Sequence, residues 1–452
     1  MNFNDINKVH FIGIGGIGVS AVAKYFLALK KTVSGSDVHQ SALTEELERR
    51  GIKINYQHQA NNLDSQTDLV IYSPAVLPTN PERVEALQLN IKQLSYPEFL
   101  GELSRQHQTI AIAGTNGKST TTAMIGKIFE AAGLDPTIIV GTQVPGFDGN
   151  LRMGQSDLLI VEACEWKAHM LHLAPQTIVL TDLVPDHLDF YKDLDDLKQY
   201  FQKFIDLLPE AGLLAHNGDD PSLAGLNKKS QTVSWGIANQ KVDSLALEIK
   251  IKDQQQFFKV GDTEFSLKLP GQYNIYNALA AISVARYFKI NDDVIKQALA
   301  QFSGCWRRFE VLGPLKGKPD TLVISDYAHH PKALKGLISA AKEFYPDRRL
   351  FLVFQPHHYD RTYKLFKEFT ESFTGADFSI INEIYDVAGR EKDGERKVSS
   401  LDLVKAINQN NVIYSPDLEE TGKMILKNAL PNDLILMVGA GDIDDLAREL
   451  VL

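Results

Sequence analysis

The sequence predicts an α/β fold with three domains, and two observations carry that prediction. Short apolar runs typical of buried strands alternate with helix-like stretches, and this alternation restarts twice along the chain. The chain has 452 residues, more than one hydrophobic core usually supports, since domains commonly contain about 100 to 200 residues. We therefore expect domains at residues 1–104, 105–304 and 305–452.

The first α/β segment opens with the apolar run "VHFIGIG" and continues through a helix-like stretch to a second strand-like run that ends at Asp37. Its loop fits the GxGxxG pattern, which lets a diphosphate approach the backbone, and a carboxylate about 20 residues further on can bind a ribose. The loop residues are Gly13, Gly15, Gly16, Ile17 and Gly18. A Rossmann-like domain is predicted, and NAD or another nucleotide diphosphate would satisfy this pattern equally well.

A second glycine loop, "GTNGKS", follows the strand-like run "QTIAIAG" and precedes a helical pattern that should end at Gly133. It is a shortened P-loop, because Gly114 stands three residues before Gly117, where the GxxxxGK[ST] pattern requires five. Lys118 would reach the β- and γ-phosphates of ATP, and the Ser119 hydroxyl would bind Mg²⁺. A central P-loop ATPase-type domain is predicted, with ATP contacts at Gly114, Thr115, Asn116, Gly117, Lys118, Ser119 and Thr120.

Two acidic segments follow strand-like runs in the central part of the chain. Glu162 ends the run in "DLLIVEACEWK", and His187 follows the run "TIVL". Ligands of α/β sheets collect at the carboxyl ends of the strands, so a carboxylate and an imidazole there could hold a divalent cation that bridges ATP phosphates. The alternatives are purely structural roles: a salt bridge or a helix cap for Glu162, and a hydrogen bond to a neighbouring residue for His187.

Further polar residues stand later in the chain. Asn274 and Asn277 come just ahead of a strongly helical stretch, where their amides could cap the helix or bind a base edge, and the chemistry alone favours capping. A zinc site at the paired histidines in "SDYAHHP" and "FQPHHYDRT" would require further ligands, which spacing along the chain does not identify. Arginines near them favour recognition of a carboxylate or a phosphate.

The composition limits the classes of partner and compartment. The net charge of -10, from 47 basic and 57 acidic residues, argues against a nucleic-acid or anionic-membrane surface. The two cysteines, Cys164 and Cys305, form neither a disulfide framework nor a zinc motif, as expected in a reducing compartment. The N-terminus has no secretory leader pattern and no apolar run reaches the ~20 residues of a membrane helix. We expect a cytoplasmic protein that is a monomer or a homodimer.

Taken together, the motifs resemble one family throughout the chain, the Mur ligases, and within it the alanine-adding branch. The motifs that carry the resemblance, in the family's order, are "HFIGIGGIG", "SGSD", "AGTNGKSTTT", "DHLD", "NxxNALAAI", "RRFE", "SDYAHHP", "FQPHHYDRT", "EIYDVAGR" and "VGAGDID". The resemblance implies that the first loop binds the diphosphate of a UDP-sugar and the second loop binds ATP. It also implies a Rossmann-like C-terminal domain that closes over an amino acid.

The resemblance implies a ligase that joins L-alanine to the lactyl carboxylate of UDP-N-acetylmuramate through an acyl phosphate, in peptidoglycan precursor synthesis. ATP and Mg²⁺ are the implied cofactors. Carried over by position, Lys118, Glu162 and His187 are catalytic, and Ser119, Glu162 and His187 bind the metal. Further nucleotide contacts are Asn274, Asn277, Arg308 and Asp326. The amino-acid side comprises Tyr327, His329, His358 and Arg361.

The chain departs from the pattern of the alanine-adding branch at several places. That branch usually has histidine where Asn116 stands, threonine at Ser119, aspartate at Cys164 and arginine at His358. A histidine cannot offer the bidentate, permanently charged fork of an arginine, so recognition of the alanine carboxylate must differ here. Sister ligases carry a carbamylated lysine at the position of Phe201, and its absence agrees with the alanine-adding branch.

Three alternatives stay open. A recycling ligase would attach a preformed peptide to the same UDP-sugar, although "FQPHHYDRT" differs from what that branch shows after this strand. A dehydrogenase would require NAD-dependent turnover. A nucleotide-gated binding protein would bind ATP without releasing phosphate, and the presence of Lys118, Glu162 and His187 argues for catalysis instead.

Overall fold

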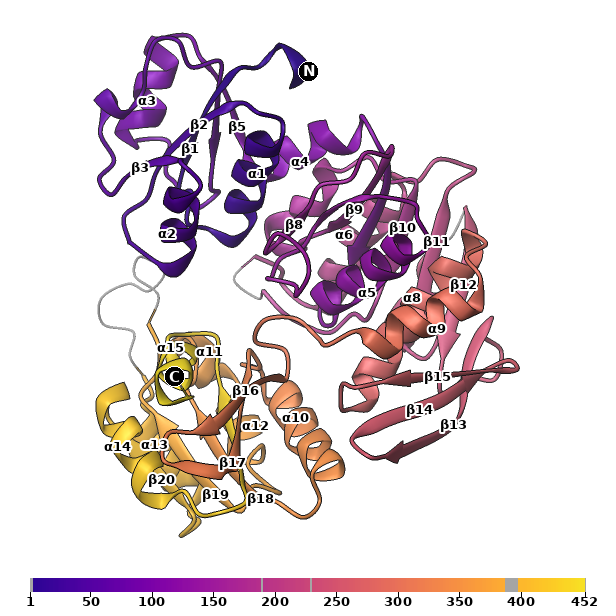
Figure 1. The fold of residues 1–452 in the computed structure, drawn as a ribbon, viewed down its shortest axis with the longest axis vertical. Coiled ribbons are helices and arrows are strands. Elements are labelled where there is room, and N and C mark those ends of the chain that lie inside the picture. The colour runs from indigo at the N-terminus through magenta and orange to yellow at the C-terminus, as the bar shows by residue number, and fades with distance from the viewer. Residues whose placement is uncertain (1–2, 188–189, 228–229, 387–396, 452) are drawn as a thin grey trace. The chain divides into compact units, whose positions relative to one another are not determined.

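The computed structural model describes residues 3–187, 190–227, 230–386 and 397–451, which form three β-sheets flanked by helices (Figure 1). The α/β class expected from the sequence is confirmed. The chain divides into two compact units, Met1–Glu248 with Phe258–Phe265 and Ile275–Phe302, and Ile249–Phe257 with Ser266–Asn274 and Ser303–Leu452. The domain boundaries near residues 104 and 304 stay a prediction. Within the described ranges, no helix combines the length and the apolar character needed to cross a bilayer.

The N-terminal sheet has five parallel strands in the order β3-β2-β1-β4-β5. The strands are β1 (Lys8–Ile12), β2 (Thr32–Ser36), β3 (Lys53–Asn55), β4 (Leu69–Tyr72) and β5 (Lys92–Ser95). The helical elements are η1 (Phe3–Asp5), α1 (Ile17–Ala28), α2 (Ala42–Arg49), η2 (Ala60–Asn62), α3 (Pro81–Gln88) and α4 (Tyr96–Ser104). The strand order reverses between β1 and β4, and the first glycine loop follows β1, so this loop lies at the switch point where α/β sheets bind ligands.

The central sheet has ten strands in the order β15-β14-β13-β12-β11-β10-β6-β9-β7-β8. The strands are β6 (Gln108–Ala113), β7 (Thr137–Ile139), β8 (Leu151–Arg152), β9 (Leu158–Glu162), β10 (Thr177–Leu180), β11 (Leu213–Asn217), β12 (Gln231–Gly236), β13 (Ser244–Lys252), β14 (Gln255–Val260) and β15 (Thr263–Leu267). The helical elements are α5 (Lys118–Ala131), η3 (Trp166–His172), α6 (Leu194–Ile205), α7 (Pro221–Ala224), α8 (Gln272–Tyr287) and α9 (Asp292–Gln301). Strand β6 lies between β9 and β10 in parallel register, which places the loops that follow these three strands at one edge of the sheet.

The C-terminal sheet has six strands in the order β16-β17-β21-β18-β19-β20, parallel except for the antiparallel β16. The strands are β16 (Glu310–Leu315), β17 (Lys318–Asp326), β18 (Arg349–Phe354), β19 (Phe378–Asn382), β20 (Val412–Ser415) and β21 (Asp433–Val438). The helices are α10 (Pro331–Phe344), α11 (Tyr359–Lys364), α12 (Phe366–Thr370), α13 (Ser400–Ile407), α14 (Leu418–Asn428) and α15 (Ile443–Val451).

Strand β18 shows why this third sheet is covered on both faces. Leu350, Leu352 and Phe354 pack into one core with α10, α12 and α13, whereas Phe351 and Val353 pack into a second core with α14 and α15. Successive side chains of a strand point to opposite faces, so a continuous apolar run requires helices on both sides. Figure 1 shows these helices around the sheet.

Candidate functional site

The second glycine loop joins β6 to α5, and its two glycines are required by the space around them. Gly114 has φ of 132° and Gly117 has φ of 79°, in the region that residues with a Cβ atom rarely adopt. A Cβ atom on Gly114 would overlap the Thr181 hydroxyl, and one on Gly117 would overlap the Asn277 side-chain oxygen. Helix α5 then runs from Lys118, and Gly133 with φ of 74° follows its end, as the sequence predicts.

Lys118 is held by the loop and by one buried carboxylate. Its Nζ donates to the carbonyl oxygens of Gly114 at 2.7 Å and Thr115 at 3.0 Å, and it lies 3.0 Å from both carboxylate oxygens of Glu165. Burial alone would lower the pKa of Lys118, but attraction to Glu165 and Glu162 outweighs burial and raises the pKa. The ammonium group therefore stays charged at the N-terminus of α5, where a phosphate would bind.

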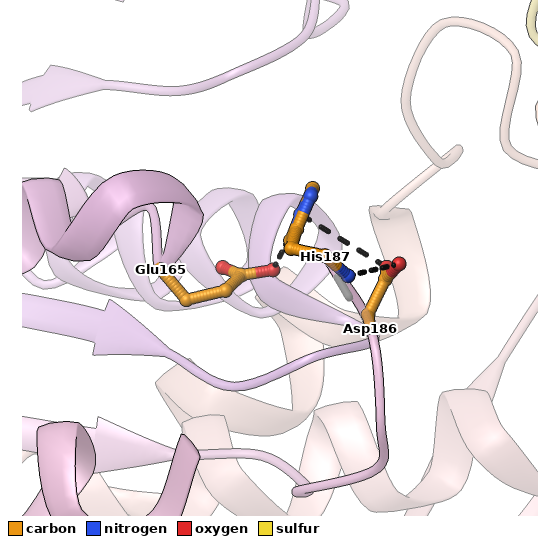
Figure 2. Close-up of side chains that lie close together, drawn as sticks. All are labelled: Glu165, Asp186 and His187. Atoms are coloured by element: carbon orange, nitrogen blue, oxygen red, sulfur yellow. Dashed lines mark hydrogen bonds and ion pairs between the residues drawn. The ribbon is translucent and has the colours of Figure 1, made fainter. Parts of the chain in front are cut away.

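Glu165, Asp186 and His187 bring their side chains together beside Lys118, as Figure 2 shows for the trio. His187 Nε2 lies 3.5 Å from Glu165 Oε1 and 4.0 Å from Asp186 Oδ2. Burial would raise the pKa of Glu165, but Lys118 and His187 together lower it, so the carboxylate is ionised. One ligand atom from each of the three lies within 4.8 Å of the others. Carboxylate oxygens and an imidazole nitrogen at this spacing fit a divalent cation.

Glu162, which the sequence singles out as a metal ligand, does not belong to this trio. It ends β9, and its Oε2 accepts a hydrogen bond of 2.8 Å from the backbone N–H of Gly141. Glu165 stands three residues after the end of β9, and its carboxylate lies beside His187. Cys164 stands between Glu162 and Glu165 in the sequence, and burial raises the pKa of its thiol to about 12, so the thiol is protonated at neutral pH.

The first glycine loop is closed by Asp37. Asp37 Oδ2 accepts from the backbone N–H of Gly15 at 2.8 Å, and its Oδ1 accepts from the N–H groups of Val38 and His39. A Cβ atom on Gly18 would overlap the Tyr96 ring, so this glycine lets α1 pack closely. Binding of a ribose by Asp37 stays a prediction, and the structure adds that this carboxylate shapes the loop.

A buried polar network links the N-terminal sheet to α3 and η2, and it was not predicted from the sequence. The Glu82 carboxylate accepts from Ser36 Oγ at 2.6 Å and from Asn62 Nδ2 at 2.5 Å, and it lies 3.3 Å from His10 Nε2. Burial would raise the pKa of Glu82, but hydrogen bonds from His10, Ser36 and Asn62 outweigh burial and lower it. This carboxylate joins α3 to the strands that carry the first glycine loop.

The two asparagines lie inside α8 rather than ahead of it, so the expectation that they cap this helix is wrong. The helix begins at Gln272, directly after the turn at Gly271, which has φ of 85°, so it starts earlier than the apolar pattern suggests. Asn274 Nδ2 donates to the carbonyl of Pro270 at 2.8 Å, and Asn277 Oδ1 accepts from Thr121 Oγ1 of α5 at 3.2 Å. Asn277 thus lies against the second glycine loop.

In the C-terminal unit, Asp326 ends β17 and is buried. Its two carboxylate oxygens accept from the backbone N–H groups of Phe309 at 2.7 Å and Ala328 at 2.8 Å, and burial raises its pKa. The Arg308 guanidinium lies 4.9 Å from the centre of the Tyr327 ring. Asp326 therefore holds the backbone just after Arg308 and just after Tyr327, the two residues whose side chains pack together.

Tyr327, His329 and His358 come together at the carboxyl ends of β17 and β18, with His357 between them. Ring centres are 5.2 Å apart for Tyr327 and His329, 6.1 Å for His329 and His357, and 4.0 Å for His357 and His358. His358 has φ of 70° and precedes α11, which carries Arg361. Tyr385, which the sequence did not single out, stacks on His357 with ring centres 5.7 Å apart.

Family models for three domains match the chain in order. The model described as "Mur ligase family, catalytic domain" matches residues 8–108, "Mur ligase middle domain" matches 112–285, and "Mur ligase, glutamate ligase domain" matches 307–441. The chain belongs to the Mur ligase family. The resemblance drawn from its motifs is confirmed.

Individual Mur ligases match over almost the whole length. The UDP-N-acetylmuramate–L-alanine ligase of Clostridium novyi (strain NT) is 41% identical over 460 residues, which cover 98% of this chain and 98% of the relative. The crystal structure of UDP-N-acetylmuramate-alanine ligase from Thermotoga maritima aligns with a TM-score of 0.84, 28% identity and 98% coverage of both chains. A murein peptide ligase from Psychrobacter arcticus aligns with a TM-score of 0.71 over 98% of both chains, and its 24% identity shows a shared fold.

Sequence reasoning on this Mur ligase singled out the second glycine loop and His187, whose role in binding ATP and metal stays a prediction. It did not single out Glu165 and Asp186, or Asp182, which accepts hydrogen bonds from Asn116 of that loop. A signal for Asp186 was present, because it directly precedes His187 in the "DHLD" motif. Parts of two quoted motifs, residues 188–189 and 387–390, lie outside the described residues.

Proposed function

We propose that this Mur ligase joins L-alanine to the lactyl carboxylate of UDP-N-acetylmuramate, with conversion of ATP to ADP and phosphate. Relatives of that name match nearly the whole chain. The observation that carries the chemistry is the meeting of Lys118, Glu165 and His187 at the phosphate loop. A charged ammonium group beside a carboxylate–imidazole cluster suits phosphoryl transfer, in which negative charge spreads over the transferred group.

The reaction has two steps. A lactyl carboxylate oxygen attacks the γ-phosphorus of ATP, ADP leaves, and an acyl phosphate forms. The amine of L-alanine then attacks the acyl carbon, the phosphate leaves with the original carboxylate oxygen, and the amine loses a proton as the amide forms. Lys118, held in place by the carbonyls of Gly114 and Thr115, would bind the transferred phosphoryl group.

We propose Glu165, Asp186 and His187 as the residues that hold Mg²⁺, together with the Ser119 hydroxyl at the start of α5. This assignment replaces Glu162 by Glu165, because Glu165 lies beside His187 whereas Glu162 bonds Gly141. When bound, Mg²⁺ would neutralise charge on the ATP phosphates.

The remaining contacts are carried over from the motifs that this chain shares with the family. The first glycine loop with Asp37 would bind the UDP diphosphate and ribose. The adenine and nucleotide contacts would be Asn274, Asn277, Arg308 and Asp326. The amino acid would be bound by Tyr327, His329, His358 and Arg361, with domains at residues 1–104, 105–304 and 305–452.

A panel of acceptors tests this function. Phosphate release and product mass would be measured with ATP, Mg²⁺, UDP-N-acetylmuramate and, in turn, L-alanine, glycine, L-serine or a preformed peptide. We expect release with L-alanine and a product that contains one alanine. Turnover only with the peptide would favour the recycling ligase instead. Lys127→Ala, on the same helix as Lys118 but paired with Glu130, is the matched control for Lys118→Ala.

A further inference from the structure

Asp182 lies directly beside the phosphate loop because of the register between two strands. Leu180 of β10 pairs with Ala113 of β6, and the N–H of Thr181 donates to the Ala113 carbonyl at 3.0 Å. The chain after β10 therefore leaves the sheet alongside the loop that begins at Gly114. The overlap that a Cβ on Gly114 would make with Thr181 shows how closely the two segments approach.

The Asp182 carboxylate takes both donors of Asn116, the residue at the tip of the loop. Its Oδ1 accepts from the Asn116 backbone N–H at 2.6 Å, and its Oδ2 accepts from Asn116 Nδ2 at 2.7 Å. The Asn116 carbonyl accepts from Thr181 Oγ1 at 2.6 Å, and the Thr115 N–H donates to the Asp182 carbonyl at 3.0 Å. Four hydrogen bonds thus join two successive loop residues to two successive residues after β10.

The hydrogen bonds of Asn116 lie next to the carbonyls that bind Lys118. Asn116 stands between the two glycines whose positive φ angles turn the loop, so the loop could pivot there if Asn116 were not held. The carbonyls that orient Lys118 Nζ belong to Gly114 and Thr115, immediately before Asn116. A carboxylate suits this place because both its oxygens accept, one from the backbone N–H and one from Nδ2 of Asn116.

We propose that Asp182 is a positioning residue for the phosphate loop, which it holds through Asn116 so that Lys118 points at the transferred phosphoryl group. The proposal rests on the proposed function in taking this loop as the ATP site. Asp182 itself has no role in the chemical step. Its effect is expected on ATP affinity and turnover, and not on the UDP-sugar.

A charge-swap cycle tests the proposal. Asn116→Asp sets two carboxylates against each other, and Asp182→Asn leaves only one acceptor for two donors. The double variant N116D/D182N restores both hydrogen bonds, because the amide placed at position 182 can accept from the backbone N–H at position 116 and donate to the carboxylate placed there. Charge-assisted hydrogen bonds of this kind affect binding by about ten- to a hundredfold.

We expect each single variant to raise the ATP KM, and the ADP dissociation constant measured by calorimetry, by about tenfold or more. The double variant should return both to within about threefold of the wild type. The KM for UDP-N-acetylmuramate should stay unchanged in all three. Asp243→Asn is the matched control, because Asp243 likewise accepts from the backbone N–H and the side chain of one residue, Ser234.

Two outcomes would overturn the proposal. One is a loss of thermal stability in the single variants with unchanged ATP KM and ADP affinity, which would make the pair a purely structural contact. The other is a double variant as impaired as the two single variants combined. Failure of the proposed function is distinguishable, because the wild type would then release no L-alanine-dependent phosphate, whereas the ADP calorimetry tests the loop itself.

Discussion

Replacing the Glu165 carboxylate by an amide, as Glu165→Gln, should damage both stability and turnover. Its side chain is 4% exposed, lies 3.0 Å from Lys118 Nζ and is 3.5 Å from His187 Nε2. Breaking a buried ion pair from one side commonly costs about 3–5 kcal/mol. Lys118 keeps the carbonyls of Gly114 and Thr115 as partners, so we expect the lower end, about 3 kcal/mol. Loss of the proposed metal ligand and of its charge beside Lys118 should lower kcat roughly 100- to 1,000-fold.

Glu162→Gln is the matched comparison, because it makes the same chemical change three residues away. The amide oxygen of glutamine can still accept from the Gly141 N–H, so the expected cost in stability is below about 1 kcal/mol. Urea unfolding measures the free energy of unfolding of each variant, and Mg²⁺ titration of phosphate release measures the Mg²⁺ requirement of turnover. We expect Glu165→Gln to shift the Mg²⁺ requirement upward and Glu162→Gln to leave it near that of the wild type. The opposite pattern would refute the reassignment and restore the ligand predicted from the sequence.

Three further predictions concern other parts of the chain. Lys118→Ala should abolish phosphate release, whereas UDP-N-acetylmuramate binding, measured by calorimetry, should stay within about threefold of the wild type. The reason is that the two glycine loops follow strands of different sheets. An equal loss of sugar binding in a folded variant would contradict that division. Glu82→Gln should cost about 1–3 kcal/mol in unfolding free energy at neutral pH. Since the folded pKa of Glu82 is lowered, this difference is present above the unfolded carboxyl pKa of about 4.3 and should shrink as the pH falls through the folded value, and a pH-independent difference would count against the network. Arg361→Ala should raise the KM for L-alanine about ten- to a hundredfold and spare that for ATP. His358→Arg should lower the KM for L-alanine, because a guanidinium offers a carboxylate a permanently charged, bidentate fork, and unchanged values in both variants would move the amino-acid site elsewhere.

The sequence predicted local structure best where the backbone conformation requires particular residues at a fixed spacing. Gly114, Gly117 and Lys118 form a loop between a strand and a helix, and Gly133 follows the end of that helix, so spacing alone located this loop. The position of the α8 start was mispredicted, because the turn at Gly271 lies outside the apolar periodicity.

Contacts between side chains that follow different strands could not be predicted from the sequence. Glu162 and Glu165 look alike in "DLLIVEACEWK", and only the path of the chain after β9 brings Glu165 to His187 and Lys118. Asp182 likewise meets Asn116 because β10 lies next to β6, a neighbour relation that spacing along the chain does not contain.

The path of one oxygen atom tests the central claim most directly. UDP-N-acetylmuramate labelled with ¹⁸O in its lactyl carboxylate would be incubated with the protein, ATP, Mg²⁺ and L-alanine, and the phosphate and the sugar product would be weighed by mass spectrometry. Ligation through an acyl phosphate predicts L-alanine-dependent phosphate that carries one ¹⁸O, together with a product that contains one alanine and has lost one ¹⁸O. Unlabelled phosphate, or phosphate release that does not depend on L-alanine, would contradict the account.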